Sequence, residues 1–372
     1  MTVWIQNPFD GLPSEGGRKQ RYWLMSEAFV RAGHRVVYWT SDFSHATKRR
    51  RAPVPSSDVP DGMDVRFVPT PSYSSNVGFA RLASHRAYAA KCLRLASKET
   101  DAPGLIVSSM PTISAAAAAL QLGRRFGARV VVDVQDAWPE TFERLFPERL
   151  RRVAHLLFAP WRRRARRIYR QADMVTGVCD RYRALTGRAD YYRAYLGIER
   201  VPEVTAAPAG GGTRRLVYSG NLGRSYDLAT VVDAVRADES LELDVAGFGS
   251  FSCDCPRVRF HGLLSASELR TLYARCDIGV IPMRDDSWVG VPNKMSDYSA
   301  AGLRIVSSLG GETAALLEAY GCGATYAPGD AASLAAAVRA ASALPKGASR
   351  RMFEREFDAA KIYDDYVIRV LQ

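Results

Sequence analysis

The sequence predicts an α/β fold with two domains, each built on a parallel sheet whose faces are covered by helices. Short apolar runs alternate with longer amphipathic stretches along the chain, a pattern typical of parallel strands joined by helices. Two expected helices, at 21–33 and 113–127, each stop at a glycine, which commonly terminates helices. Residues 201–214 are rich in proline, alanine and glycine, so we expect a linker there.

The expected elements form one set on each side of this linker. Strands of the first set are expected at 3–6, 35–40, 105–109, 129–134 and 174–178. The second set has strands at 215–220, 241–247, 278–283 and 304–308 and helices at 228–237, 266–275 and 331–342. We therefore expect domains at 1–200 and 215–350, and a C-terminal helix at 351–372 that packs back toward the N-terminal domain.

Composition excludes several classes of protein. With 47% hydrophobic and 24% charged residues, the 372-residue chain is globular. The sequence shows no run of about 20 apolar residues that could cross a bilayer, and its first residues lack a signal-peptide pattern, so we expect a cytoplasmic protein. Only two of the six cysteines, Cys253 and Cys255, are close in sequence. Because a second pair of ligands at zinc-site spacing is missing, we expect no metal.

An excess of basic residues suggests an anionic partner. The chain has 51 basic and 39 acidic residues, a net charge of +12, and much of the excess lies in 144–170. Apolar residues recur among these arginines at helical spacing, although Pro160 must interrupt the helix. We expect this segment to bind an anionic membrane surface by inserting Phe158 and Trp161; the alternative is that its apolar face packs on the first domain. Nucleic acid is disfavoured, because no recognised binding module or spaced aromatic residues accompany the arginines.

Glycine-bearing turns precede a helix in each half of the chain. Gly16 and Gly17 come before the helix at 21–33, and Gly220 to Gly223 follow the strand at 215–220. Glycine lets a phosphate approach the backbone, and the helix that follows offers free N–H groups to the anion. The alternative is that both turns are only tight connections.

Lys294 and Asp297 follow the apolar strand at 278–283 and therefore lie at the carboxyl edge of the second sheet, where open parallel sheets bind ligands. Pro292 suits the start of a helix, and residues three apart share a helix face. Lys294 can then hold a diphosphate, and Asp297 can accept hydrogen bonds from ribose hydroxyls. The alternative is an ordinary intrahelical ion pair.

Three segments carry a resemblance to a known family. The strings PNKMSDYSAAGLRIVSS, YSGNLGRSYDLATVVDAV and DVQDAWPETF resemble GT-B glycosyltransferases of family 4, and are most similar to the bacterial branch that builds O-antigen and other surface polysaccharides. The resemblance covers nearly the whole chain. It implies two Rossmann-like domains facing each other across a cleft, a nucleotide sugar bound by the second, an acceptor bound by the first, and transfer with retention of configuration without a bound metal ion.

Some residues depart from the family pattern. Family 4 usually has two glutamates eight positions apart, and here Val289 takes the earlier position and Asp297 the later. The usual arginine and lysine after the first strand of the second domain are replaced by Asn221 and Tyr226, with Arg224 between them. Gln135 takes the place of a histidine or arginine before Asp136 and cannot transfer a proton.

The resemblance and the motifs together give a candidate site. We expect Lys294, Arg224 and Asp136 to act in catalysis: Lys294, Arg224 and the amides of Gly220 to Gly223 stabilise the charge of the leaving diphosphate, and Asp136 acts on the acceptor side. Asp285 and Asp286 are interpreted as a loop turn. The donor-binding residues are Gly220, Asn221, Gly223, Arg224, Asn293, Lys294 and Asp297, and the acceptor-side residues are Gly16, Gly17, Gln135 and Asp136.

The expected function is transfer of a hexosyl or N-acetylhexosaminyl group from a nucleotide sugar, with uridine diphosphate favoured and guanosine or thymidine diphosphate left open. The acceptor would be a glycan or a lipid-linked glycan in polysaccharide or glycoconjugate biosynthesis, reached at the inner face of the cytoplasmic membrane. Two alternatives remain open: a nucleotide-sugar epimerase with the same fold, and a non-catalytic partner subunit that binds nucleotide sugars.

Overall fold

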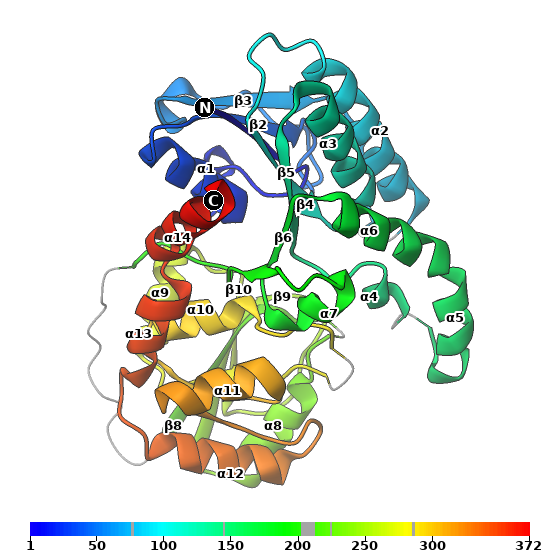
Figure 1. The fold of residues 1–372 in the computed structure, drawn as a ribbon. Coiled ribbons are helices and arrows are strands. Elements are labelled where there is room, and N and C mark those ends of the chain that lie inside the picture. Colours follow the sequence, from blue (N-terminus) through cyan, green and yellow to red (C-terminus); the bar gives the residue numbers. More distant parts are fainter. Residues whose placement is uncertain (76–77, 144–145, 202–212, 224, 285–286) are drawn as a thin grey trace. The chain divides into compact units, whose positions relative to one another are not determined.

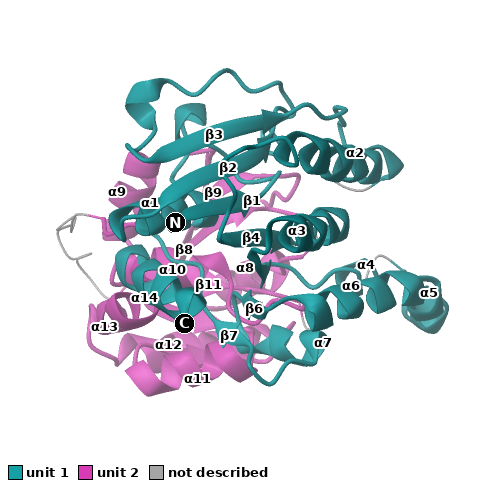
Figure 2. Cartoon of the chain, turned by 45° about the horizontal axis from the view of Figure 1, so that its top comes forward, with its two compact units in different colours: residues 1–198, 359–372 teal, residues 199–358 magenta. Residues whose placement is uncertain are grey.

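The computed structural model describes residues 1–75, 78–143, 146–201, 213–223, 225–284 and 287–372. They form two compact units: unit 1 comprises residues 1–198 and 359–372, and unit 2 comprises residues 199–358 (Figure 2). Most of the expected linker, including 202–212, lies outside the described residues. The chain re-enters unit 1 at Ala359, later than the expected residue 351.

Unit 1 is built on a seven-stranded parallel sheet with the strand order β3-β2-β1-β4-β5-β6-β7. Its central strands are buried along almost their whole length, as expected of a sheet covered on both faces. The strands are β1 (Thr2–Gln6), β2 (Arg35–Ser41), β3 (Met63–Val68), β4 (Leu105–Met110), β5 (Arg129–Val134), β6 (Met174–Gly177) and β7 (Tyr192–Arg193).

Helices flank this sheet in two groups. Helix α2 packs on α3 and α3 packs on α6, while α14 at the end of the chain packs on α1 (Figure 1). The helices are α1 (Arg21–Arg31), α2 (Phe79–Ala96), α3 (Ile113–Phe126), α4 (Glu140–Glu143), α5 (Arg151–Leu157), α6 (Ala159–Gln171), α7 (Arg183–Thr186) and α14 (Ala359–Leu371). Short 3₁₀ turns lie at Pro13–Glu15, Ser56–Asp58, Glu148–Leu150 and Asp180–Tyr182.

A buried ion pair joins α1 to the middle of the sheet. Arg21 at the start of α1 donates from Nε and Nη2 to the Asp133 carboxylate on β5, at 2.8 and 2.9 Å. Tyr22 and Thr176 donate their hydroxyls to the same carboxylate at 2.7 and 2.6 Å. Burial acts to raise the pKa of Asp133, but Arg21 and these hydrogen bonds hold it below its ordinary value. The charge is thus compensated inside the core.

Unit 2 repeats the plan with a six-stranded parallel sheet in the order β10-β9-β8-β11-β12-β13. The strands are β8 (Arg214–Asn221), β9 (Leu241–Phe248), β10 (Val258–Gly262), β11 (Ile278–Ile281), β12 (Arg304–Ser307) and β13 (Gly323–Thr325). The helices are α8 (Leu228–Ala237), α9 (Ala266–Ala274), α10 (Asn293–Ala300), α11 (Gly311–Tyr320), α12 (Ala331–Ser342) and α13 (Ala348–Met352), with a π-helical turn at Phe353–Phe357.

Glycines in unit 2 allow its elements to approach closely. A Cβ on Gly247 of β9 would lie 1.8 Å from the Gly220 carbonyl oxygen on β8, and one on Gly279 of β11 would lie 2.3 Å from the Tyr298 ring on α10. Both contacts are far shorter than any real carbon approach. Glycine at these positions therefore holds α10 against the sheet and keeps the carboxyl ends of β8 and β9 together.

The α/β fold with two Rossmann-like domains is confirmed, and every expected strand is present. The sequence interpretation missed strands β3, β7, β10 and β13 and the long helix α2. In the described part of the chain, no helix has the length and apolar character that crossing a membrane requires.

Candidate active site

Lys294 is buried at the carboxyl edge of the sheet in unit 2. It lies in the first turn of α10, which begins after Pro292, and its side chain is shielded although it carries a charge. Its Nζ atom lies 3.9 Å from the centroid of the Tyr226 ring and 4.7 Å from that of the Tyr218 ring. Two aromatic faces therefore hold the ammonium group by cation–π attraction.

Gly220 provides the space that Lys294 occupies. Gly220, the last residue but one of β8, has a φ of 131°, a backbone conformation that favours glycine. A Cβ at this position would lie 2.9 Å from Lys294 Nζ. The lysine thus projects over bare backbone at the point between β8 and β11 where the strand order reverses, the position at which open parallel sheets bind ligands.

Burial tunes the charge of this lysine. Desolvation lowers the pKa of Lys294 to about 8, while the Asp297 carboxylate on the same helix opposes the shift. Burial also raises the pKa of Tyr218 and of Tyr226, so both phenols stay neutral. At neutral pH Lys294 is therefore a largely desolvated cation, which is suited to binding an anion such as a diphosphate.

The other expected donor-binding residues lie on α10 and in the turn after β8. Asp297 is half-buried one turn further along α10, while Asn293 is exposed at its first position. Asn221 is exposed and Gly223 half-buried in the turn after β8, and the Asn221 carbonyl accepts a hydrogen bond from the Tyr218 hydroxyl. Val289 lies half-buried in the loop before α10. Arg224, Asp285 and Asp286 lie outside the described residues.

The helix start after the Gly220–Gly223 turn carries a cap of its own. The helix after the Gly220–Gly223 turn, α8, is capped by its own Asp227, whose carboxylate accepts from the Thr230 amide and hydroxyl at 3.4 and 2.6 Å. Leu222 N donates to Phe248 O at 2.8 Å. The Asp227 carboxylate takes up the Thr230 N–H and puts a negative charge at the amino end of α8, which disfavours an anion at this helix start.

Helices α10 and α11 differ from α8 in this respect. Within the described residues, neither helix receives a hydrogen bond from an N-cap side chain, because Pro292 and Gly310 occupy those positions. The two helix starts are linked, since Thr313 in the first turn of α11 donates its hydroxyl to Gly290 O at 2.7 Å. Their backbone N–H groups and dipoles add positive potential beside Lys294.

Gly310 and Gly311 are candidate site residues that the sequence interpretation missed. Gly311 has a φ of 59°, and a Cβ at either position would meet open space. The signal was present in the sequence as a Gly-Gly pair between the strand at 304–308 and a helix, the same pattern used to select Gly16 and Gly17.

The expected acceptor-side glycines lie at the start of unit 1. Gly16 terminates the turn Pro13–Glu15 with a φ of 80°, and both Gly16 and Gly17 are exposed. They precede α1 without contributing its N-cap, which is Gln20. The structure therefore places them on the surface near the amino end of α1.

Asp136 and Gln135 follow β5, as expected. Asp136 accepts hydrogen bonds from Ala137 N, Trp138 Nε1 and Thr141 Oγ1, at 2.8, 3.0 and 3.3 Å. Burial raises the pKa of Asp136, and these bonds oppose the shift. The carboxylate thereby fixes the Trp138 indole. Gln135 is half-buried, and its backbone N–H donates to Met110 O at 3.1 Å.

A cluster of aromatic and basic side chains surrounds Trp138, and we call it the acceptor-side cluster. Its members come from the segments after β1, β2, β3 and β5 and from the start of α2, so it lies at the carboxyl edge of the sheet in unit 1. Arg81 lies 4.7 Å above the Trp138 ring and 5.1 Å above the Phe9 ring. The cluster consists of Phe9, His45, Lys48, Tyr73, Arg81, His85 and Trp138.

The two histidines of this cluster are neutral hydrogen-bond acceptors. Lys48 Nζ can only donate, so its 3.2 Å contact makes His45 Nδ1 an acceptor. Arg81 Nε likewise donates to His85 Nε2 at 3.3 Å. Burial and the nearby cations lower the pKa of His45 to about 4 and of His85 to about 3. The sequence interpretation found no motif at His45 and did not select the others, because five separate segments assemble the cluster.

The basic segment 144–170 is less free than its sequence suggests. The helix breaks at Phe158, and Pro160 lies in the first turn of α6. Trp161 and Phe158 are half-buried and pack against Phe142, and buried Arg162 pairs with Glu143 and the His155 carbonyl. The expected insertion of Phe158 and Trp161 into lipid stays a prediction, and the exposed apolar residues of this segment are Leu150, Val153, Leu156 and Leu157.

We also looked for side chains that could bind a metal ion. In the described ranges, no group of three or more histidine, cysteine, aspartate or glutamate side chains is arranged to hold an ion. Cys253 is half-buried and Cys255 is buried, and both are free thiols.

Comparison with known families identifies the class of this protein. Residues 16–202 match the family described as glycosyl transferase 4-like domain, and residues 213–343 match glycosyl transferases group 1. The first match alone spans half of the chain. The chain therefore belongs to the glycosyltransferases of this group. No curated protein sequence shows a significant match.

Solved structures show the same GT-B fold at low sequence identity. Sucrose-phosphate synthase from Thermosynechococcus elongatus is 14% identical with a TM-score of 0.71, over 100% of this chain and 98% of that one. Anabaena HepE in complex with UDP-glucose is 14% identical with a TM-score of 0.66, over 100% and 99%. The lipopolysaccharide outer core galactosyltransferase WaaB, in its apo form, is 12% identical with a TM-score of 0.66, over 100% of both chains.

Proposed function

We propose that this glycosyltransferase moves a hexosyl or N-acetylhexosaminyl group from a uridine diphosphate sugar with retention of the anomeric configuration. The observation that carries the proposal is the Lys294 ammonium held between Tyr218 and Tyr226, over Gly220, at the strand-order reversal of unit 2. The Anabaena HepE structure contains UDP-glucose, and this similarity favours uridine diphosphate over other nucleotides.

The chemistry needs a stabilised leaving group. The bond between the anomeric carbon and the β-phosphate oxygen breaks, and a bond from an acceptor hydroxyl oxygen to that carbon forms on the same face of the sugar. The acceptor proton passes to the departing phosphate oxygen. Lys294 and the uncapped starts of α10 and α11 neutralise the charge that develops on the diphosphate. Asp297 accepts hydrogen bonds from the ribose hydroxyls.

The acceptor binds unit 1 in this proposal. The half-buried side chains of Phe9, Lys48 and Arg81 offer an apolar ring and hydrogen-bond donors to a sugar that carries hydroxyl groups, and buried Trp138 supports them from below. Asp136 acts by positioning Trp138 through its indole hydrogen bond. The reaction class is extension of a glycan or lipid-linked glycan in surface polysaccharide assembly, of which O-antigen synthesis is one case.

Peripheral attachment to an anionic membrane accompanies this role. The apolar side chains Leu150, Val153, Leu156 and Leu157 are 42–73% exposed on or beside α5, and exposed arginines follow on α6. An amphipathic helix with a basic flank inserts its apolar face at the headgroup layer, and each basic residue near the surface adds about 1 kcal/mol.

Release of UDP from UDP-glucose, UDP-galactose and UDP-N-acetylglucosamine without acceptor tests the proposal. Slow hydrolysis that Lys294→Ala abolishes, but that Lys346→Ala leaves unchanged, supports a transferase; Lys346 is an exposed lysine paired with Asp277 in the same unit. Conversion of the donor to an epimer without UDP release would support the epimerase alternative. Donor binding without any turnover, even with lipid-linked glycans added, would support the non-catalytic alternative.

A further inference from the structure

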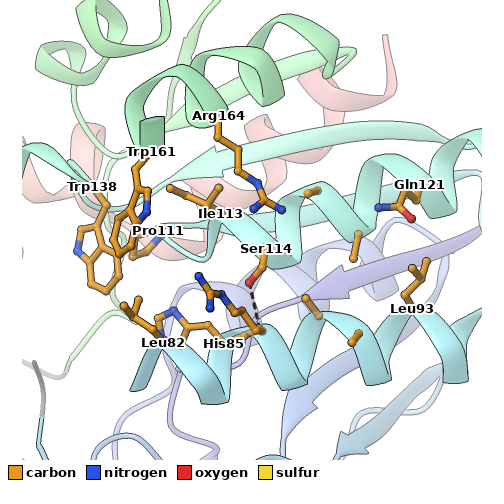
Figure 3. Close-up of a pocket in the computed structure, with 15 residues that line it drawn as sticks. Leu82, His85, Leu93, Pro111, Ile113, Ser114, Gln121, Trp138, Trp161 and Arg164 are labelled. Carbon is orange, nitrogen blue, oxygen red and sulfur yellow. Dashed lines mark hydrogen bonds between the residues drawn. The ribbon is translucent and has the colours of Figure 1, made fainter. Parts of the chain in front are cut away.

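Helices α2, α3 and α6 enclose an apolar groove beside the acceptor-side cluster. One part, of about 360 Å³, is lined mainly by leucine, alanine, isoleucine and tryptophan side chains. Figure 3 shows Trp138 and Trp161 at one end of this part and Leu93 and Gln121 at the other. Trp138 and His85 belong both to the groove and to the acceptor-side cluster, so the two sites adjoin.

The groove continues between α3 and α6. A second part, of about 680 Å³, shares Ala117, Gln121 and Arg164 with the first. Its lining adds Arg124, Arg163 and Arg167. The combined space is therefore elongated along α3, and it is wider than a single ring or sugar requires.

The charged side chains that line the described part of this groove are all positive. Arginines line both parts, and no carboxylate occurs among the described lining residues. In Figure 3 the Arg164 side chain extends from α6 toward Ser114 on α3. An occupant with a long apolar body and a negatively charged group complements these walls, because guanidinium groups bind phosphate oxygens in paired hydrogen bonds.

Exposed apolar residues lie next to the groove. Phe79, which begins α2, is 90% exposed and lies one helical turn before the lining residue Leu82. The exposed leucines of α5 immediately precede α6 in the chain. Apolar side chains of this kind are costly in water but suit a surface that meets the hydrocarbon of a bilayer.

We propose that this groove holds the hydrocarbon chain of a lipid-linked acceptor whose phosphate groups bind the lining arginines. The proposal rests on the proposed function and specifies its acceptor as a phosphate-bearing lipid instead of a free glycan. Bound in this way, the lipid presents its sugar to the acceptor-side cluster through the end of the groove that Trp138 and His85 share with it.

Calorimetric titration of the full-length protein with hexyl, octyl and decyl phosphate, each below its micelle concentration, tests the groove. Affinity should rise with chain length, by up to about fourfold for each methylene that becomes buried. Decanol, which lacks the anion, and inorganic phosphate, which lacks the chain, should bind at least tenfold more weakly than decyl phosphate. Equal affinity for hexyl and decyl phosphate, or for decyl phosphate and decanol, would overturn the proposal.

Matched variants locate the binding. Ala117→Phe fills the part shared by both ends of the groove and should weaken decyl phosphate at least tenfold, whereas Ala83→Phe, at an exposed site of α2 outside the lining, should not. Arg164→Gln should weaken decyl phosphate but not decanol, and Arg170→Gln, exposed on the same helix outside the lining, should weaken neither. Unchanged affinity in folded Ala117→Phe would contradict the assignment.

The same variants separate this inference from the proposed function. Ala117→Phe should retain wild-type affinity for UDP and wild-type hydrolysis of the donor sugar, because Lys294 lies in the other unit. If the protein hydrolyses the donor but its affinity for alkyl phosphates does not depend on chain length, the lipid groove is refuted and the transferase stands. Chain-length-dependent binding without donor turnover would refute the transferase and leave the lipid site standing.

Discussion

Lys294 Nζ lies 3.9 Å from the centroid of the Tyr226 ring. Tyr226 stands where the family resemblance leads one to expect a lysine, so an aromatic face replaces a second cation. Two neutral tyrosines hold the Lys294 ammonium at this edge of the sheet. Diphosphate binding should therefore depend on Lys294 and on its protonation.

The first prediction concerns pH. Because burial lowers the pKa of Lys294 to about 8, the free protein loses the ammonium charge as the pH rises through 8. A bound diphosphate favours the charged form and raises this pKa, so affinity for UDP should be constant below pH 7 and fall about tenfold by pH 9. Calorimetry at pH 6, 7, 8 and 9 measures this fall. Lys294→Arg, which stays charged, should flatten the profile; an unchanged fall in that variant would assign it to another group.

The second prediction concerns the space over Gly220. Gly220→Ala should weaken UDP binding at least tenfold, because the new Cβ would displace Lys294 Nζ from a position 2.9 Å away and the φ of 131° disfavours alanine. Gly262→Ala is the control: its φ of 67° is also positive and favours glycine, but a Cβ there meets open space. Both variants should lower stability, by about 1–3 kcal/mol. Equal UDP affinity in the two would show that strain alone matters.

Sequence reasoning succeeded where a local pattern decides the structure. Pro292 before Lys294 placed the lysine in the first turn of α10, and the strand at 278–283 placed that turn at the carboxyl edge of the sheet. The Asp227 cap on α8 was also readable from the sequence but was overlooked in favour of the glycines before it.

Long-range packing accounts for what the sequence could not supply. Nothing local to Tyr226 indicates that its ring faces Lys294, since this contact follows from the pairing of β8 with β11. The acceptor-side cluster joins Phe9, His45 and Trp138 from three different segments. Part of the apolar face predicted for 144–170 packs inside unit 1, where Trp161 contacts Phe142.

The third prediction concerns the buried ion pair in unit 1. Asp133→Asn should lower the free energy of unfolding by about 3–5 kcal/mol, because it leaves the Arg21 guanidinium buried without its counter-charge. Asp64→Asn removes one of the two exposed partners of Arg35, the other being Asp101, and should cost about 1 kcal/mol or less. Urea unfolding at pH 7 compares the two. Similar losses would mean that burial does not strengthen the Arg21–Asp133 pair.

The same pair predicts a dependence on acid. The folded-state pKa of Asp133 is held below its ordinary value, so its contribution to stability is present above the unfolded pKa, near 3.9, and is lost as the pH falls through the folded value. The difference in unfolding free energy between wild type and Asp133→Asn should therefore shrink as the pH falls. If the difference in stability between wild type and Asp133→Asn stays constant down to pH 2, ionisation of Asp133 is not the source of the pair's contribution.

The fourth prediction concerns the membrane. The protein should float with anionic but not with zwitterionic vesicles, and binding should weaken with salt because the attraction is screened. Glutamine at Arg163, Arg164, Arg166 and Arg167, which are exposed on α6, should reduce binding strongly, and so should Leu156→Ser with Leu157→Ser. Arg162 is excluded because it is buried against Glu143. Equal flotation with both vesicle types, or with neither, would refute the attachment.

A fifth prediction separates the two ends of the donor nucleotide. Asp297→Asn should weaken UDP more than 2′-deoxyuridine diphosphate, because the carboxylate accepts stronger hydrogen bonds from ribose hydroxyls than an amide does. Asp233→Asn, which neutralises an exposed carboxylate on α8 of the same unit, is the control for loss of one negative charge. The same loss for both nucleotides would remove Asp297 from the ribose.

The central claim is that Lys294 holds the diphosphate, and calorimetry with UDP and uridine on folded Lys294→Ala tests it most directly. A charge-assisted hydrogen bond contributes about 1.5–3 kcal/mol, so the variant should bind UDP about ten- to hundredfold more weakly than wild type at pH 7. Uridine, which has no phosphate, should bind both proteins within about twofold. An equal loss of affinity for UDP and uridine, or no loss for either, would contradict the account.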